Sequence, residues 1–299
     1  MSSIFIFPGQ GSQAVGMGKE LYDNNPIARA VFDEVDAVLG QKLSDIIFNG
    51  PLEELTLTAN VQPAIMATSI AMLRVSGAEL TPFVAGHSLG EYTALCAAGA
   101  LSLADTAKLL RLRGDSMQRA VPVGVGAMAV VLGLDIDALT AVCRDAEKQA
   151  GDGMVCDIAN DNSPGQVVIS GSKPAIEAAM ELAKAAGAKR AMLLPLSVPP
   201  HSRLMEPVAI EMRAALEQTE IRVPSVPLIS NKTCAPMTDV NEIKEALVYQ
   251  ITHGVRWRES ILAMPALGIT ETIEVGPGNV LTSMTSRIEP IMTAKKLEI

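Results

Sequence analysis

The feature that most restricts the fold of this chain is a short apolar strand that runs directly into a glycine-flanked serine. Residues 83–85 are apolar, Gly86-His87-Ser88-Leu89-Gly90 follows them, and residues 91–98 form a strongly helical stretch. A G-x-S-x-G sequence between a strand and a helix is typical of a tight, strained turn that exposes the serine hydroxyl at the end of a sheet. Because this turn needs a strand before it and a helix after it, the pattern predicts an α/β fold.

Much of the chain alternates short apolar strands with helical patterns, which indicates a mostly parallel, helix-covered sheet with an α/β-hydrolase-like core. The expected strands are residues 4–7, 81–85, 226–230 and 270–275. The expected helices extend to about residue 39 and then cover 63–73, 91–98, 103–119, 202–218, 240–252 and 256–264, with a last helix after residue 278. Pro63 is expected in the first turn of its helix, where proline is tolerated.

A different pattern occupies the middle of the chain. The sequence predicts strands at 127–132, 154–160, 166–170 and 190–194, with helices at 135–149 and 173–186 and a turn at 161–165. That βαββαβ order is the split-βαβ arrangement of ferredoxin-like domains. We therefore predict a discontinuous large domain, residues 1–122 and 195–299, with a ferredoxin-like subdomain inserted at residues 123–194.

Composition excludes several classes of protein. Hydrophobic residues make up 48% and charged residues 19%, as in a globular protein, and the net charge of −9 disfavours nucleic acid as a partner. No leader-like segment and no apolar run of membrane-spanning length is visible, so no membrane association is expected. The four cysteines are scattered without a CxxC or Cys/His cluster, so we expect no metal site and a cytoplasmic location.

A serine nucleophile needs a base, and the chain has three histidines. His87 adjoins Ser88, but neighbours on a tight turn seldom face each other. His253 lies near a helix end and is expected at the surface. His201 follows Pro199 and Pro200 in a loop that these prolines stiffen, which suits a base that must hold one position. Elimination therefore favours His201.

The chain resembles malonyl-CoA:acyl carrier protein transacylases over essentially its whole length. The resemblance rests on several separate motifs in the same order: residues 7–13 (FPGQGSQ), 86–92 (GHSLGEY), 111–114 (RLRG) with 117–118 (MQ), 162–166 (NSPGQ), 199–201 (PPH), 230–231 (SN) and 274–278 (EVGPG). The inserted ferredoxin-like subdomain is also a property of that family.

The resemblance implies a role for each of several residues. Ser88 would carry the acyl group as an ester, and His201 would act as the base. The main-chain N–H groups of Gln10 and Leu89 would form the oxyanion hole, and the glycines beside Gln10 would allow the main chain to approach the substrate. A carbonyl oxygen, rather than a buried carboxylate, would orient the histidine.

The resemblance also implies how the substrate is recognised. Arg113 would pair with the free carboxylate of malonate, with Arg111 as its rival on the same helix. Gln62 and Asn231 match positions that line the acyl pocket, and Gln250 matches a side chain close to the histidine. One departure is Pro200, which stands where a small polar or aromatic residue is expected and leaves fine acyl specificity open.

The implied substrates are malonyl-CoA and acyl carrier protein, with coenzyme A thioester as substrate and no cofactor. Because carrier proteins are acidic and this chain is also acidic, a local basic patch is expected for docking. Lys189, Arg190 and Arg287 match docking positions of the family.

Three other interpretations stay open. One is a serine hydrolase such as a thioesterase, against which stand Arg113 and the absence of an obvious triad acid. Another is a malonyltransferase that serves a polyketide or malonate decarboxylase carrier protein. The third is a non-catalytic carrier-protein scaffold, which the joint presence of Ser88, His201 and Arg113 disfavours.

Overall fold

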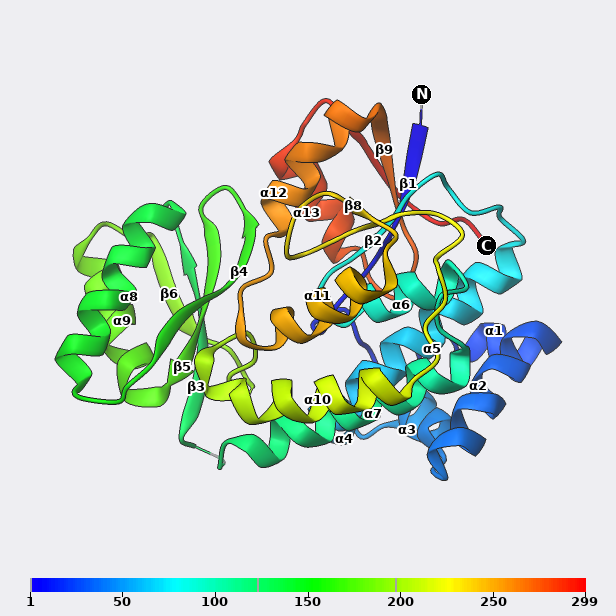
Figure 1. The fold of residues 1–299 in the computed structure, drawn as a ribbon, viewed down its shortest axis with the longest axis horizontal. Helices are drawn as coiled ribbons and strands as arrows, with labels where there is room; N and C mark the ends of the chain where they lie inside the picture. Colours follow the sequence, from blue (N-terminus) through cyan, green and yellow to red (C-terminus); the bar gives the residue numbers. More distant parts are fainter. Residues whose placement is uncertain (1, 123, 197) are drawn as a thin grey trace.

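The structure, a computed structural model, describes residues 2–122, 124–196 and 198–299. The domain boundary predicted at residue 123, and Ser197 in the loop before the histidine, lie outside the described residues. Two separate sheets organise the chain (Figure 1). The larger sheet has the strand order β10-β9-β1-β2-β7-β8, and the smaller has the order β4-β5-β3-β6.

The larger sheet is mostly parallel, as predicted. Its strands are β1 (Ser2–Phe7), β2 (Val84–Gly86), β7 (Leu228–Ile229), β8 (Pro236–Met237), β9 (Ile269–Glu274) and β10 (Thr293–Lys296). Four neighbouring pairs are parallel and only β7 and β8 are antiparallel. β1 is central, and its residues 4–7 are buried on both faces, which explains the uninterrupted apolar run Ile-Phe-Ile-Phe.

Helices cover both faces of this sheet. Phe5 and Phe7 point into a core shared with α2 (Pro26–Leu39), α5 (Thr58–Ser76), α6 (Gly90–Ala97), α7 (Leu103–Ala120), α10 (Glu206–Gln218) and α11 (Val240–Thr252). Ile4 and Ile6 point to the other face, where α12 (Trp257–Ala263), the 3₁₀ turn η2 (Met264–Leu267) and α13 (Val280–Ile288) pack. The short elements α1 (Lys19–Asn24), α3 (Leu43–Asn49), α4 (Leu52–Thr56) and η1 (Arg203–Met205) complete this part.

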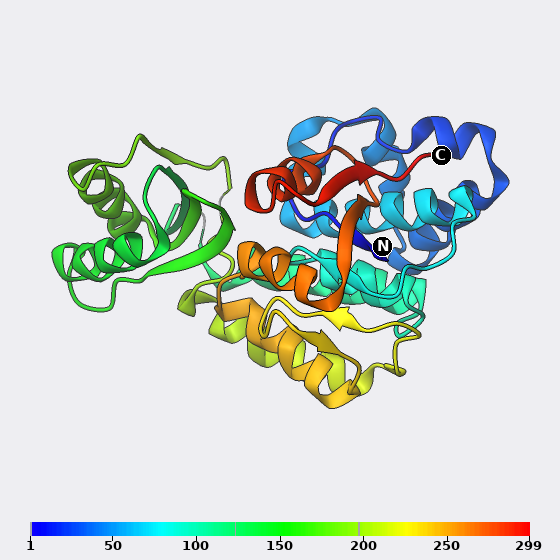
Figure 2. The same cartoon turned by 90° about the horizontal axis from the view of Figure 1, so that it is seen from above.

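The smaller sheet has the predicted βαββαβ order. It comprises β3 (Gly126–Leu132), α8 (Ile136–Ala150), β4 (Cys156–Ser163), β5 (Gln166–Ser172), α9 (Lys173–Ala185) and β6 (Arg190–Leu193), and all its pairs are antiparallel. α8 and α9 pack on one face, through a core that includes Val131 and Val167. They lie on the outer side of this unit, away from the rest of the chain (Figure 2). The opposite face carries Met128, Ala159 and Val168 and is turned toward the larger unit.

Main-chain and side-chain bonds attach β4 to the larger unit. Val255 forms a parallel bridge with Asn160, in which Asp161 N–H donates to Val255 O at 3.0 Å and Val255 N–H donates to Ala159 O at 2.9 Å. The carboxylate of Asp161, which is almost fully buried, pairs with Arg258 of α12 at 2.8 Å. These contacts hold the open face of the small sheet over the ends of the large one.

Several sequence-based boundaries were wrong. α5 begins at Thr58, so Pro63 lies inside the helix rather than in its first turn. The burial of residues 58–71 provides the packing that overrides this unfavourable position. Residues 161–163, predicted as a turn, belong to β4, because part of their pairing comes from the distant Val255. β7 covers only two of the five residues predicted, and α3, α4, β8 and β10 were not predicted.

Within the ranges given above, no helix is both long enough and apolar enough to cross a membrane.

Candidate active site

The glycine-flanked serine forms the predicted strand–turn–helix. β2 ends at Gly86, α6 begins at Gly90, and Ser88 between them has a left-handed backbone with φ 54°. A Cβ at Gly86 would lie 1.9 Å from the carbonyl carbon of Gly90, and a Cβ at Gly90 would lie 2.2 Å from Phe7 O. Both glycines are therefore required for the chain to fold back on β1, and the strained serine is held at the carboxyl end of the sheet.

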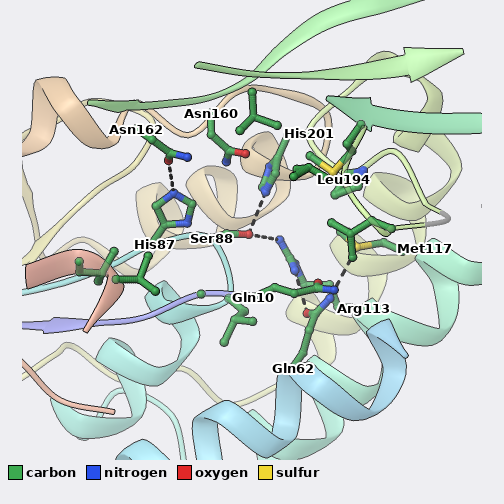
Figure 3. A pocket seen from close by; sticks show the side chains of 18 of the residues that line it. Gln10, Gln62, His87, Ser88, Arg113, Met117, Asn160, Asn162, Leu194 and His201 are labelled. Atoms are coloured by element: carbon green, nitrogen blue, oxygen red, sulfur yellow. Dashed lines mark hydrogen bonds between the residues drawn. The ribbon is translucent and has the colours of Figure 1, made fainter. Parts of the chain in front are cut away.

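His201 faces the nucleophile. Its Nε2 lies 2.8 Å from Oγ of Ser88, and its Nδ1 lies 2.6 Å from the main-chain oxygen of Gln250 (Figure 3). Since a carbonyl oxygen can only accept, we assign the ring proton to Nδ1, which leaves Nε2 to accept from the serine hydroxyl. His201 has φ 61° and its N–H donates to Ile251 O at 3.1 Å, so both the backbone and the ring are fixed.

The environment keeps this histidine neutral. Burial, reinforced by the positive charge of Arg113, lowers the pKa of His201 to about 3. The other two histidines do not reach Ser88. His87 Nε2 contacts Asn162 Oδ1 at 2.8 Å, and burial lowers its pKa as well. His253 is exposed at the end of α11, as predicted, and stacks on Tyr249.

Arg113 points directly at the nucleophile. Its side chain is buried, with 2% exposed, and Nη2 donates to Ser88 Oγ at 3.0 Å and to Gln250 Oε1 at 2.7 Å. Nη1 donates to Gln62 Oε1 at 2.7 Å (Figure 3). Its Nε has no protein partner among the described residues. A permanent cation next to the reactive serine, with donor capacity to spare, is suited to binding a carboxylate.

Arg111, the rival, points elsewhere. Its guanidinium donates to Asn60 Oδ1 at 2.9 Å and to Gln41 Oε1 at 2.7 Å, and it does not line the cavity. Gly114 explains how its neighbour Arg113 comes close to Gln62, because a Cβ at Gly114 would lie 2.5 Å from Thr58 O at the start of α5. The glycine therefore allows α7 and α5 to pack at short distance.

Asn231 and Gln250 lie behind the serine rather than on the cavity wall, where the resemblance placed Asn231. Asn231 Oδ1 accepts from Ser88 N–H at 2.9 Å, and Nδ2 donates to Gly86 O at 2.7 Å. Gln250 Nε2 donates to Ser88 O at 3.2 Å. These bonds satisfy the polar groups of the strained turn on both sides of Ser88. Gln62, by contrast, lies on the wall.

Two residues that line the cavity together with Ser88 have a main-chain N–H group that is free of protein acceptors among the described residues. They are Gln10, in the loop after β1, and Leu89, at the start of α6. The side-chain Nε2 of Gln10 is likewise buried without a partner among the described residues. A Cβ at Gly9 would lie 2.8 Å from His87 O, so only glycine lets the two loops approach this closely. Free N–H donors beside a nucleophile are the ingredients of an oxyanion hole.

A cavity of about 150 Å³ joins these groups. Its inner end is polar, with Ser88, His201, Arg113 and Gln62. The remaining wall comes from both units, and its residues are Gly9, Gln10, His87, Leu89, Met117, Met128, Asn160, Asn162, Val168, Leu194, Leu196, Pro200, Val280, Leu281 and Met284. The open face of the small sheet thus forms part of the cavity wall, and α13 contributes Val280, Leu281 and Met284 to it.

The expected docking cations lie at the surface. Lys189, Arg190 and Arg287 are exposed, and Arg287 Nη1 donates to Gln166 Oε1 at 2.7 Å. Arg190 and Gln166 are both paired with Leu132, so Arg190 and Arg287 lie along one end of the small sheet. Nowhere in residues 2–122, 124–196 and 198–299 do three or more His, Cys, Asp or Glu side chains gather as metal ligands.

Sequence reasoning missed Glu91. It is fully buried, accepts from Asn231 N–H at 2.7 Å and from Gln250 Nε2 at 2.5 Å, and burial raises its pKa to about 7. A glutamate in the first turn of a helix is ordinarily an exposed partner of the helix dipole, which hid this role. The sequence of the helix could have revealed this burial, because residues 90–95 form no polar face that would place Glu91 at the surface.

Comparisons with known proteins agree with this geometry. Residues 4–290 match the acyl transferase domain family. A malonyl CoA-acyl carrier protein transacylase of Bacillus subtilis is 50% identical over 291 residues, which cover 96% of this chain and 91% of the relative. The Escherichia coli K12 protein of the same name is 44% identical over 296 residues, covering 98% and 94%.

Solved structures give the same picture. The acyl-carrier-protein-S-malonyltransferase of Bartonella henselae superposes with a TM-score of 0.96 at 50% identity, covering 100% of this chain and 96% of the other. A malonyl-transacylase in complex with its type II PKS acyl-carrier protein gives 0.95 at 41% identity, covering 99% and 96%. The predicted α/β fold is confirmed, and this chain belongs to the acyl transferase family and is an acyltransferase.

Proposed function

We propose that this chain transfers the malonyl group from malonyl-CoA to the phosphopantetheine thiol of acyl carrier protein through a malonyl-Ser88 intermediate. The observation that carries the proposal is Arg113, a buried cation 3.0 Å from the nucleophile. A neutral acyl group would leave this charge without a counter-ion in the cavity, whereas the free carboxylate of a malonyl group supplies one. The names of the relatives point to the same substrates.

In the first half-reaction, Ser88 Oγ attacks the thioester carbonyl while His201 Nε2 takes the hydroxyl proton. The negative charge on the carbonyl oxygen is stabilised by the N–H groups of Gln10 and Leu89. The C–S bond then breaks, the coenzyme A sulfur takes the proton back from His201, and the acyl group remains on Ser88 as an ester. A histidine with a pKa of about 3 is neutral before the attack and is therefore ready to accept the proton.

The second half-reaction reverses these roles. The carrier-protein thiol gives its proton to His201 and attacks the ester carbonyl, and the same N–H groups stabilise the oxyanion. The bond to Ser88 Oγ breaks and His201 returns the proton to the serine. Because the two acyl carriers use the site in turn, ping-pong kinetics are expected.

A hydrolase is the alternative that shares this chemistry. Ser-His-Asp hydrolases polarise the histidine with a carboxylate, whereas His201 Nδ1 contacts the neutral carbonyl of Gln250. The apolar side chains that make up most of the cavity wall also disfavour bound water near the ester. Both features support a transferase that keeps its acyl-enzyme until a thiol arrives.

The remaining parts of the proposal concern context. We assign docking of the carrier protein to the surface formed by Lys189, Arg190 and Arg287, and treat residues 123–194 as the inserted subdomain that forms one wall of the cavity. Neither a metal nor another cofactor is needed for these steps. Fatty acid biosynthesis in the cytoplasm is the proposed setting, and the four cysteines form no disulfide in the part of the chain that the structure describes.

The test is intact-protein mass spectrometry after mixing with malonyl-CoA and, separately, acetyl-CoA. Wild-type protein should gain one malonyl group, and Ser88→Ala should gain none. Free malonate released without an adduct would indicate a hydrolase, and equal loading of acetyl would indicate a general acyltransferase.

A further inference from the structure

Glu91 is the one fully buried carboxylate that contacts the residues behind the nucleophile among the described residues. It is the second residue of α6, three positions after Ser88. Its two oxygens accept one bond each, from the main-chain N–H of Asn231 and from the side-chain Nε2 of Gln250. None of the steps described above uses it as an acid, a base or a ligand.

The direction of these bonds determines how Gln250 is oriented. An amide side chain has a donor end and an acceptor end, and rotating it by half a turn exchanges them. Gln250 now presents Nε2 to Glu91 and to Ser88 O, and Oε1 to Nη2 of Arg113. The reversed orientation would place its NH₂ group against the guanidinium, where two donors would face each other.

A carboxylate prevents that reversal because both of its oxygens accept. Asn231 contributes a main-chain N–H, which can only donate, so Oε1 of Glu91 is committed to it. Oε2 then offers Gln250 an acceptor and nothing else. We propose that Glu91 is a positioning residue that fixes the side-chain amide of Gln250, and thereby holds Arg113 beside Ser88 in the arrangement that receives a carboxylate-bearing acyl group.

This inference rests on the proposed role of Arg113 and adds the means by which its guanidinium is oriented. Figure 3 shows that guanidinium between Gln62 and Ser88. Gln62 accepts from Nη1, so Gln250 is the second amide acceptor, on Nη2. The charged and titratable groups around Glu91 are Arg113 of α7, the adjacent Tyr92 and Cys234 after β7. Burial outweighs the two donors and Arg113 in setting the pKa of about 7, so Glu91 is ionised above neutral pH.

The test uses Glu91→Gln, which keeps the size of the side chain but makes one end a donor. The new amide would give its oxygen to Asn231 N–H and its NH₂ group to Gln250. Gln250 would then turn its oxygen away from Arg113. At about pH 8, above the pKa of Glu91, the kcat/KM for malonyl loading should fall about tenfold to a hundredfold, as for loss of a hydrogen bond to a buried charge.

A second readout separates positioning from general damage. A neutral fluorophosphonate reacts with Ser88 through His201 and the oxyanion hole and has no carboxylate for Arg113. Its labelling rate should fall much less in Glu91→Gln than the rate of malonyl loading. The matched control is Glu274→Gln, since Glu274 is equally buried and accepts from the N–H groups of Leu281 and Thr282, away from Arg113. That control should affect stability but leave the ratio of the two rates unchanged.

Coupling to Gln250 is tested with a double-mutant cycle. Gln250→Met removes the amide but keeps the main-chain carbonyl that orients His201. If Glu91 acts through that amide, Glu91→Gln should cost little further malonyl loading in the Gln250→Met background. The inference would be overturned if the losses in malonyl loading of the two single variants multiplied in the double variant. It would also be overturned if the ratio of malonyl loading to fluorophosphonate labelling were unchanged in Glu91→Gln.

Should Glu91→Gln not fold, the double variant Glu91→Gln/Gln250→Met decides, because it removes the amide whose orientation the new glutamine would reverse. It should fold and load malonyl at the rate of Gln250→Met, whereas failure to fold, or a much lower rate, would mean that Glu91 is needed for a reason unrelated to Gln250. The proposed function has a separate failure, namely absence of malonyl loading by the wild-type protein.

Discussion

Nδ1 of His201 lies 2.6 Å from the main-chain oxygen of Gln250, so a neutral carbonyl orients the base of this enzyme. A carbonyl stabilises the imidazolium less than a carboxylate would, and the base is correspondingly weak. The buried carboxylate in the neighbourhood, Glu91, reaches Gln250 through its side chain and not His201 itself. The arrangement favours attack by a thiol, which loses its proton more readily than water.

The first prediction follows from this weak base. In the absence of carrier protein, steady hydrolysis of malonyl-CoA should be at least about a hundredfold slower than transfer to carrier protein, the lower end of the contribution of a well-matched general base. Measuring free malonate and malonyl-carrier protein in parallel checks this. Comparable rates would mean that the site activates water efficiently and would favour the hydrolase interpretation.

The second prediction concerns acid stability. His201 has a lower pKa when folded, about 3, than when unfolded, about 6.5, so the unfolded chain takes up its proton first as the pH falls. The contribution of His201 is therefore complete above about pH 6.5 and is lost progressively toward pH 3. Between about pH 6.5 and pH 5, wild-type protein should lose about 2 kcal/mol more unfolding free energy than His201→Gln. Urea unfolding at the two pH values measures this difference, and an equal loss in both proteins would contradict it.

A pair of arginines on α7 gives the third prediction. Arg113→Ala should lower the kcat/KM of malonyl loading about a hundredfold or more, because a bidentate, buried pairing with the substrate carboxylate is lost. Acetyl loading, which needs no cation, should not fall with it. Arg111→Ala is the matched control, since it lies two residues earlier and contacts Asn60 and Gln41 instead. If malonyl-loading assays showed the same loss of kcat/KM in Arg113→Ala and Arg111→Ala, Arg113 would have no special role in binding the malonyl carboxylate.

The fourth prediction concerns the turn that holds Ser88. Gly86→Ala places a methyl group 1.9 Å from the carbonyl carbon of Gly90, so about 3 kcal/mol or more of unfolding free energy should be lost, together with acyl loading. Gly40→Ala is the control, because Gly40 has φ 61° but no atom within 4 Å of the new methyl group. It should cost only about 1 kcal/mol and leave loading intact. Similar unfolding curves for the two variants would show that close approach is not what requires Gly86.

Much of this site could be predicted from the sequence because its key signals are local. The turn at Ser88 and the stiff loop before His201 each depend on residues within a few positions, and the family motifs identified Gln10 and Arg113. The missing parts depend on long-range contacts. β4 continues to Ser163 because Val255 pairs with it, and Glu91 is buried because α6 is enclosed on every side. Neither fact is encoded within a sequence window of helix or strand length.

The last prediction tests docking of the carrier protein on the small sheet. Ala191 points into the core under α8 and α9, so its neighbour Arg190 points to the opposite face, the one that carries Val168 and Met128 of the cavity wall. An acidic carrier protein that delivers its arm to this cavity would therefore meet Lys189 and Arg190 at its rim. The double variant Lys189→Glu/Arg190→Glu should raise the apparent KM for carrier protein about fivefold or more while malonyl-CoA loading stays unchanged.

The control for this prediction is Lys148→Glu/Lys173→Glu, which changes the net charge by the same amount. Lys148 and Lys173 lie on α8 and α9, the outer helices of the small unit in Figure 1, and both are exposed. Lys173 N–H donates to Val125 O and Lys189 N–H donates to Leu132 O, so Lys173 and Lys189 lie at opposite ends of β3. If docking depends on a local patch, this variant should keep a nearly normal KM, because charges more than a Debye length away are screened. An equal rise of KM in both variants would mean that only net charge matters, and no rise in either would place the carrier protein elsewhere. Repeating the assay at higher ionic strength should shrink the difference between wild type and Lys189→Glu/Arg190→Glu, since the attraction acts across solvent.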